Sequence, residues 1–92
     1  MARVELTRHL YEYFPGLAEV DLEVDARDVA GVIAELERRV PGFAFYVCDE
    51  RGRLRQHVNV FVGDEMVTDR RSLTDTVDAD TRVLIMQALS GG

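Results

Sequence analysis

The hydrophobic period of this chain changes near Asp25, and this change constrains its fold more than any other feature. Residues 19–25 alternate strictly, with three aliphatic side chains on one face and four carboxylates on the other, as in a half-buried strand. Apolar residues then recur at helical spacing and predict one stripe of an amphipathic helix, formed by Val29, Ile33, Leu36 and Val40. We expect Asp25 to cap this helix, Glu35 to pair with Arg39, and Pro41-Gly42 to end it.

Short apolar segments on either side of the helix predict further strands. These are expected at Val4–Thr7, Phe43–Cys48, about Arg53–Val62 and Arg82–Ala88. Turns, helical turns or irregular segments are expected at residues 8–16, 49–52, 63–65 and 67–80. In the last of these segments, we expect Leu73 and Val77 to reach the core.

The order of these elements predicts the fold. Residues 19–25 are expected to pair antiparallel with the first strand, and the crossover through the helix allows the last strand to pair with the first in parallel. We therefore predict an α+β chain with a β-grasp layout, in which one main helix packs across a mixed sheet of about four to five strands. We assign residues 1–88 to one domain and residues 89–92 to a flexible tail.

Composition excludes several classes of function. The net charge of −6 argues against nucleic-acid binding, because phosphate contacts need a cationic surface. One cysteine, Cys48, and two histidines are too few for a disulfide framework or a structural zinc site. Charged residues interrupt the apolar residues of the N-terminal segment, so we expect no signal peptide and no membrane span. We expect a cytoplasmic protein that binds no membrane, no metal and no cofactor of its own.

The sequence ends in Leu89-Ser90-Gly91-Gly92, directly after the last predicted strand. Glycine lacks the Cβ atom that would collide in a narrow channel, so we expect Gly91 and Gly92 to carry a free α-carboxylate into the active site of another protein. All 11 basic residues are arginine, so apart from its α-amino group the chain has no amine that an activated carboxyl group can acylate. A diglycine that arose by chance or by cloning is the alternative.

Several features together resemble a known family. These are the segment His57–Glu65, a polar segment after it, the final hydrophobic strand and the terminal diglycine. They look like the ubiquitin-like sulfur carriers of the MoaD/ThiS type, which include the small subunit of molybdopterin synthase and the thiamine-pathway sulfur carrier. The resemblance extends over essentially the whole chain.

The resemblance implies a reaction cycle at Gly92. An adenylating enzyme related to ubiquitin-activating enzymes uses ATP and magnesium to activate the Gly92 carboxylate. A persulfide enzyme then supplies sulfur and leaves a thiocarboxylate, which a sulfur-accepting synthase uses. The chain itself would be a carrier, not an enzyme, and the pathway stays open among molybdopterin (molybdenum cofactor), thiamine, cysteine, tRNA thiolation and related products. The alternatives are a ubiquitin-like modifier conjugated through Gly92 and a β-grasp interaction module without tail chemistry.

The last strand also predicts a partner-binding patch. If Val83 and Ile85 face the core, period two places Leu84 and Met86 on the outside. Phe61 is expected to join them if its strand lies alongside, and Leu89 and Ser90 extend the surface toward the tail. Exposed apolar groups of this kind mark binding surfaces, and the alternative is that they cover a second small core.

The remaining reactive residues are interpreted as structural. We expect Cys48 to be a core residue, with sulfur relay as the alternative, and His9 and His57 to make surface polar contacts. The acidic residues between positions 64 and 80 lack the spacing of a calcium loop. The run Arg51, Arg53 and Arg55 predicts a solvated hairpin, not an anion site.

Overall fold

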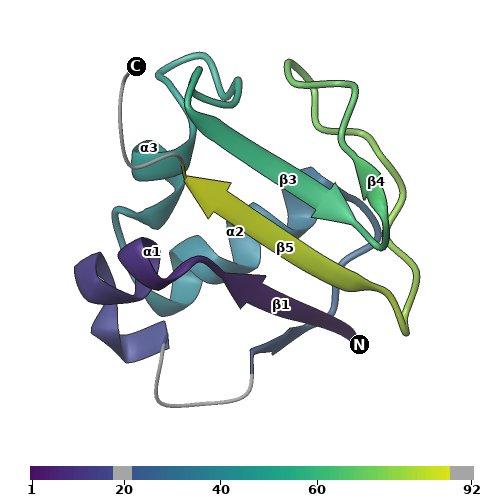
Figure 1. Cartoon of the computed structure of the whole chain (residues 1–92), viewed down its shortest axis with the longest axis horizontal. Coiled ribbons are helices and arrows are strands. Elements are labelled where there is room, and N and C mark those ends of the chain that lie inside the picture. The colour runs from purple at the N-terminus through teal and green to yellow at the C-terminus, as the bar shows by residue number, and fades with distance from the viewer. Residues whose placement is uncertain (18–21, 88–92) are drawn as a thin grey trace.

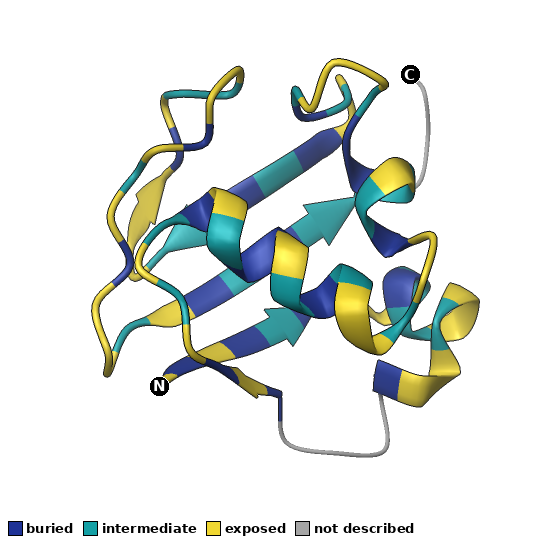
Figure 2. Ribbon diagram, turned by 180° about the vertical axis from the view of Figure 1, so that it is seen from behind, coloured by how far each residue is buried: buried dark blue, intermediate teal, exposed yellow. Residues whose placement is uncertain are grey.

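The computed structural model describes residues 1–17 and 22–87. Their five-stranded sheet has the strand order β2-β1-β5-β3-β4, with α2 packed across one face (Figures 1 and 2). The strands are β1 (Ala2–Leu6), β2 (Glu23–Val24), β3 (Val58–Val62), β4 (Glu65–Met66) and β5 (Arg82–Gln87). The helices are α1 (Arg8–Tyr13), the 3-10 turn η1 (Pro15–Leu17), α2 (Val29–Arg39) and α3 (Phe43–Val47). The predicted α+β class, mixed sheet and main helix are confirmed.

Strand β5 lies at the centre of the sheet, between β1 and β3 (Figure 1). It runs parallel to β1, with Ile85 opposite Leu6, and antiparallel to β3, with Ile85 opposite Val60. The predicted parallel pairing of the first and last strands is therefore confirmed, as is the antiparallel pairing of β1 with β2. Strand β2 covers the end of the strand predicted over residues 19–25, of which residues 19–21 lie outside the described part of the chain.

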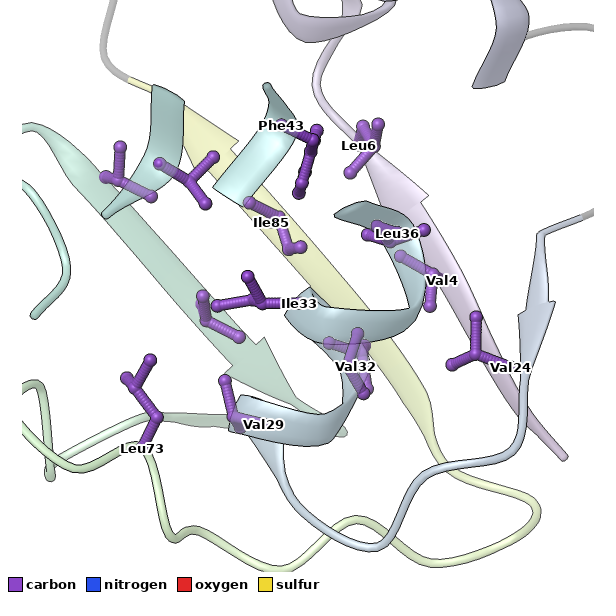
Figure 3. Close-up of a cluster of buried hydrophobic side chains, with 14 of the residues drawn as sticks. Val4, Leu6, Val24, Val29, Val32, Ile33, Leu36, Phe43, Leu73 and Ile85 are labelled. Atoms are coloured by element: carbon purple, nitrogen blue, oxygen red, sulfur yellow. The ribbon is translucent and has the colours of Figure 1, made fainter. Parts of the chain in front are cut away.

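The core lies between the sheet and α2 (Figure 3). Alternate residues of the central strands point toward the helix, and α2 contributes Val29, Val32, Ile33 and Leu36, all of them buried. Each fully buried aliphatic side chain contributes about 1.5–3 kcal/mol before chain entropy is subtracted. Because α2 packs on one face only, the outer face of the sheet has no helix over it within the described residues (Figure 1).

The first turn of α2 is capped by Asp28, so the predicted cap at Asp25 is wrong. The Asp28 Oδ1 atom accepts a hydrogen bond of 2.7 Å from the N–H of Gly31. Two more N–H groups of this turn donate to the carbonyls of Leu73 and Asp75. The free N–H groups at the start of the helix are thus satisfied partly by carbonyls from a segment far away in the sequence. The helix therefore begins next to that segment, and Asp28 is its cap.

The charged side of α2 also differs from the prediction. Glu35 accepts a 2.9 Å hydrogen bond from Arg38, one residue before the predicted partner Arg39. Arg39 instead donates to the carbonyl of Glu23 at 2.7 Å. Arg39, in the last turn of the helix, therefore bonds to β2 instead of forming an ion pair within the helix.

Helix α3 replaces the strand predicted over Phe43–Cys48, so that prediction is wrong. Gly42 precedes the helix with a φ of 101°, in the region that favours glycine. The Glu37 carboxylate of α2 accepts hydrogen bonds from the N–H groups of Gly42 at 3.0 Å and Ala44 at 2.9 Å. These bonds lower the pKa of Glu37, and the bond from Gly42 contributes most. The first and last residues of α3 are both buried, and a helix places residues four apart on one face.

The hairpin after α3 is shorter than predicted. The turn over residues 49–52 is present, and Asp49 Oδ1 accepts from the N–H groups of Arg51 and Arg53. Leu54 makes only an isolated bridge with Cys48. The return strand β3 then begins at Val58 instead of about Arg53. The predicted turn between β3 and β4 is present at residues 63–64, and Glu65, the last residue predicted for it, already belongs to β4.

Residues 67–80 are irregular, as predicted, and Leu73 and Val77 are buried. Leu73 has a φ of 56°, a left-handed conformation that strains a side chain with a Cβ. In the same segment Asp69 accepts hydrogen bonds from the Thr74 hydroxyl at 2.7 Å and the Ser72 N–H at 3.0 Å. These bonds lower the pKa of Asp69 to about 2, and the bond from Thr74 contributes most.

Candidate functional site

The outer face of the sheet presents a group of apolar side chains. On β5, Val83 and Ile85 are buried, and Leu84 and Met86, which alternate with them, point to the other face and are half-buried. Phe61 of β3 lies directly opposite Leu84, and Met66 of β4, 52% exposed, lies opposite Phe61. We call Phe61, Met66, Leu84 and Met86 the sheet-face patch. None of its members belongs to the buried core of the described residues.

The sheet-face patch is hollowed and has a charged edge. A depression of about 440 Å³ is lined by Phe61, Gly63, Asp64, Arg82, Leu84 and Met86. At its margin Arg82 Nη2 lies 2.6 Å from Glu5 Oε2, and Glu5 is the β1 neighbour of Leu84. An apolar centre with a polar margin is the usual composition of a protein-binding surface, and methionine adapts to more than one partner.

A second hollow lies at the end of β5, where the described residues stop. It measures about 370 Å³ and is lined by Phe45, Tyr46, Arg55, His57 and Gln87. Phe45 is 65% exposed, and the Arg55 guanidinium lies 5.0 Å from its ring centre. Gln87 has a buried side-chain oxygen that accepts no hydrogen bond from the described residues.

Sequence reasoning missed this second hollow. Its Phe45 and Tyr46 lie on α3, which the sequence predicts as a strand. Within the arginine run, Arg53 pairs with Asp49 at 3.2 Å, and Arg55 stacks on Phe45. The hydrogen bonds that Arg55 makes to Phe45 are exposed, and the sequence does not predict this pairing. The one available signal was a dense basic run in an acidic chain.

The other candidate residues have structural surroundings. Cys48 is buried, as predicted, and its burial raises the pKa of its thiol, so it is not an activated thiol. His9 packs edge-on against Tyr13, with ring centres 5.0 Å apart. No group of three or more His, Cys, Asp or Glu in residues 1–17 and 22–87 is arranged to hold a metal. In the same ranges no helix is both long and apolar enough to cross a membrane.

The comparison with protein families decides the assignment. A model of the ThiS family matches residues 4–92, which is nearly the whole chain and includes both terminal glycines. The chain belongs to the ThiS family. No curated protein matches it.

Solved structures agree with the ThiS assignment. This ThiS-family chain is similar to a chain in the crystal structure of the BexX/CysO complex from Amycolatopsis orientalis, with 26% identity, a TM-score of 0.83 and 100% of both chains covered. CysO from Mycobacterium tuberculosis has 23% identity and a TM-score of 0.81, covering 97% of this chain and 100% of that chain. SAMP1 from Haloferax volcanii has 22% identity and a TM-score of 0.73, covering 99% and 98%. The fold is therefore the predicted β-grasp of ubiquitin-like sulfur carriers.

The structure does not test the predictions made for the tail of this ThiS-family chain. Leu89, Ser90, Gly91 and Gly92, like the predicted boundary at residue 88, lie outside the described residues. Strand β5, which precedes them, is hydrogen-bonded on both sides, to β1 and to β3. Its residues Leu84 and Met86 belong to the sheet-face patch, and Gln87 belongs to the second hollow.

Proposed function

We propose that this ThiS-family chain is a sulfur carrier whose Gly92 carboxylate is adenylated and then converted to a thiocarboxylate. The observation that carries this proposal is the extent of the family match, which continues through Gly91 and Gly92. A match limited to the β-grasp body would support the fold without the chemistry. The chain would be a co-substrate, with its partners supplying the catalysis.

The proposed chemistry follows from the weakness of a carboxylate as an electrophile. A Gly92 oxygen attacks the α-phosphate of ATP and releases pyrophosphate, with magnesium held by the activating enzyme. A persulfide sulfur of the donor then attacks the acyl carbon, and AMP leaves. A thiol cleaves the resulting acyl disulfide and releases the thiocarboxylate, which donates its sulfur to the substrate of a biosynthetic enzyme.

Features of the chain suit this role. The absence of lysine removes the internal side-chain amines that would compete for the activated acyl group. Glycines allow close passage through a narrow channel, where a reactive end must be positioned accurately. We propose that the sheet-face patch docks the adenylating enzyme or the sulfur-accepting synthase. The similarity to a chain of the BexX/CysO complex supports a partner protein in general terms.

A second candidate is a protein modifier that is joined through Gly92 to lysines of other proteins. The observation in its favour is the similar fold of small archaeal modifier protein 1 from H. volcanii, with a TM-score of 0.71 at 20% identity. Both candidates share the adenylation step. They differ in the acceptor of the activated Gly92.

Pyrophosphate exchange tests the shared step, and mass spectrometry separates the candidates. With a purified ubiquitin-activating-like enzyme from the source organism, we expect the wild-type chain to support exchange between ATP and pyrophosphate. Gly92→Ala and deletion of Gly91-Gly92 should abolish exchange and leave thermal unfolding unchanged. Exchange by the deletion variant would refute the proposal. In protein from the native host, one oxygen replaced by sulfur indicates a carrier, and an isopeptide adduct indicates a modifier.

A further inference from the structure

The hollow at the end of β5 contains an arginine that is oriented before any ligand arrives. Arg55 donates from Nε at 3.0 Å and from Nη2 at 2.9 Å to the carbonyl of Phe45, and its guanidinium lies over the Phe45 ring. Its Nη1 makes no hydrogen bond within the described residues. A guanidinium fixed in this way loses little side-chain entropy when it binds a carboxylate.

The charge of this hollow is opposite to that of the chain. The sequence has a net charge of −6, yet the described residues that line the hollow are Arg55, His57, two aromatic residues and Gln87, and none of them is acidic. Arginine is the side chain best suited to a carboxylate. The exposed ring of Phe45 adds an apolar contact beside it. Charge complementarity therefore selects an acidic segment as the occupant.

The position of the hollow identifies where that segment comes from. Gln87 lines the hollow, and five residues separate it from the end of the sequence at Gly92, a span of at most about 17 Å. An enzyme that holds the Gly92 carboxyl group must therefore have part of its surface beside this hollow. In Figure 1, α3 lies next to the arrowhead of β5, on the helix side of the sheet.

We propose that Phe45, Arg55 and His57 form a second docking point, which binds an acidic loop at the mouth of the adenylating enzyme's tail channel. This inference rests on the proposed function and adds a partner contact to it. Met86 and Gln87 are neighbours that point to opposite faces of the sheet, so the sheet-face patch and the hollow hold the end of β5 from two sides. Two contacts fix the direction in which the tail leaves the domain, whereas a single contact would leave the domain free to rotate about it.

Charge reversal in the hollow tests the inference against a matched control. We would prepare Arg55→Glu and His57→Glu, with Arg51→Glu as the control, because Arg51 is exposed on the neighbouring turn and does not line the hollow. The readout is ATP–pyrophosphate exchange by the same adenylating enzyme at varied carrier concentration. We expect Arg55→Glu and His57→Glu to raise the KM for the carrier by about tenfold or more, with kcat unchanged. Arg51→Glu should leave KM within about twofold of wild type.

Folding and partner identity have separate controls. Arg55 contacts the backbone of α3, so thermal unfolding of Arg55→Glu is measured alongside its kinetics. His57→Glu removes no hydrogen bond present in the described residues and tests the same surface independently. Replacing an acidic residue at the mouth of the enzyme's channel by arginine should restore the KM of Arg55→Glu.

The outcomes distinguish the inference from the function on which it rests. If the wild-type chain supports no exchange, the proposed function fails and the docking point fails with it. If exchange is normal and both Arg55→Glu and His57→Glu behave like Arg51→Glu, the function stands and the docking point is refuted. If deletion of the tail shifts the NMR signals of Arg55 and His57 in the isolated protein and Arg55→Glu lowers KM, the hollow binds the chain's own carboxylate instead, which also refutes it.

Discussion

Leu84 is the position at which the partner surface is tested most directly. It lies on the central strand of the sheet-face patch, between Phe61 on β3 and Glu5 on β1. We consider Leu84→Arg and Leu84→Asp as a pair. The arginine places a cation beside Glu5, and the aspartate places a second carboxylate there. Cross-strand charge pairs change stability by about 0.2–1 kcal/mol, so the two variants are pushed in opposite directions.

The expected effect on folding is small. A fully buried leucine contributes about 1.5–3 kcal/mol, and Leu84 is only half-buried, so its replacement costs about 1 kcal/mol. Attraction to Glu5 offsets part of this in Leu84→Arg, and repulsion adds to it in Leu84→Asp. For a domain of this size, 1 kcal/mol corresponds to a shift in Tm of about 4–8 °C. Thermal unfolding should therefore place Leu84→Arg above Leu84→Asp.

The expected effect on binding is large and does not depend on the sign of the charge. A charge at the centre of a docked apolar surface must lose its water, and central interface positions commonly cost about 2 kcal/mol or more. That is a rise of about 30-fold in the KM for the carrier, measured by ATP–pyrophosphate exchange. Ala34→Arg, at an exposed position on α2, adds the same charge to the opposite layer as a control.

Two results would refute this reasoning. A folded Leu84→Arg variant with the KM of Ala34→Arg would mean that the sheet-face patch does not contact the enzyme. A loss of more than about 3 kcal/mol in the free energy of unfolding would mean that Leu84 behaves as a core residue.

Four further predictions concern stability. Asp28→Ala should lower the free energy of unfolding by about 1 kcal/mol through loss of the cap, and Asp25→Ala should change it by less than about 0.5 kcal/mol, both by urea unfolding. Because Leu73 has a φ of 56°, Leu73→Gly should be about 1 kcal/mol more stable than Leu73→Ala. If Leu73→Ala were the more stable of the two, the backbone at this position would not be strained. Gln87→Met should raise the free energy of unfolding by about 1 kcal/mol, because it removes a buried oxygen that has no hydrogen-bond partner among the described residues. Asp69 should titrate near pH 2 by NMR. The stability that its ionised form provides is complete above its unfolded pKa of about 4 and is lost as the pH falls toward 2, so Asp69→Asn should destabilise at pH 7 and differ little from wild type in strong acid.

Periodicity predicts the sheet and α2 well because both elements bury one face along most of their length. It fails at α3, because a short apolar run does not distinguish a helix from a strand. There the outcome depends on Glu37, which lies in the preceding helix and satisfies the first N–H groups of α3. The cap of α2 is similar, since carbonyls of Leu73 and Asp75 help to choose Asp28 over Asp25. Both errors come from tertiary contacts that no local pattern contains.

In the candidate site, too, local patterns predict some residues, and tertiary contacts determine the others. Period two on β5 places Leu84 and Met86 on the outer face, and the register of β3 adds Phe61. The pairing of Arg55 with Phe45 requires α3, so a strand prediction hides it. The predictions for Leu89, Ser90 and the two glycines concern residues outside the described part and remain predictions.

The position of β5 in the centre of the sheet also determines when the domain can form during synthesis. Arg3 pairs with Arg82 and Leu6 with Ile85, so nearly the whole chain must be made before β1 finds its neighbour. Contacts of such long sequence separation form late and slowly. A nascent or truncated chain that lacks β5 therefore has no complete sheet, and half of the sheet-face patch is missing from it. Under the proposed function, an enzyme that docks on this patch would therefore accept only chains in which β5 is already in the sheet.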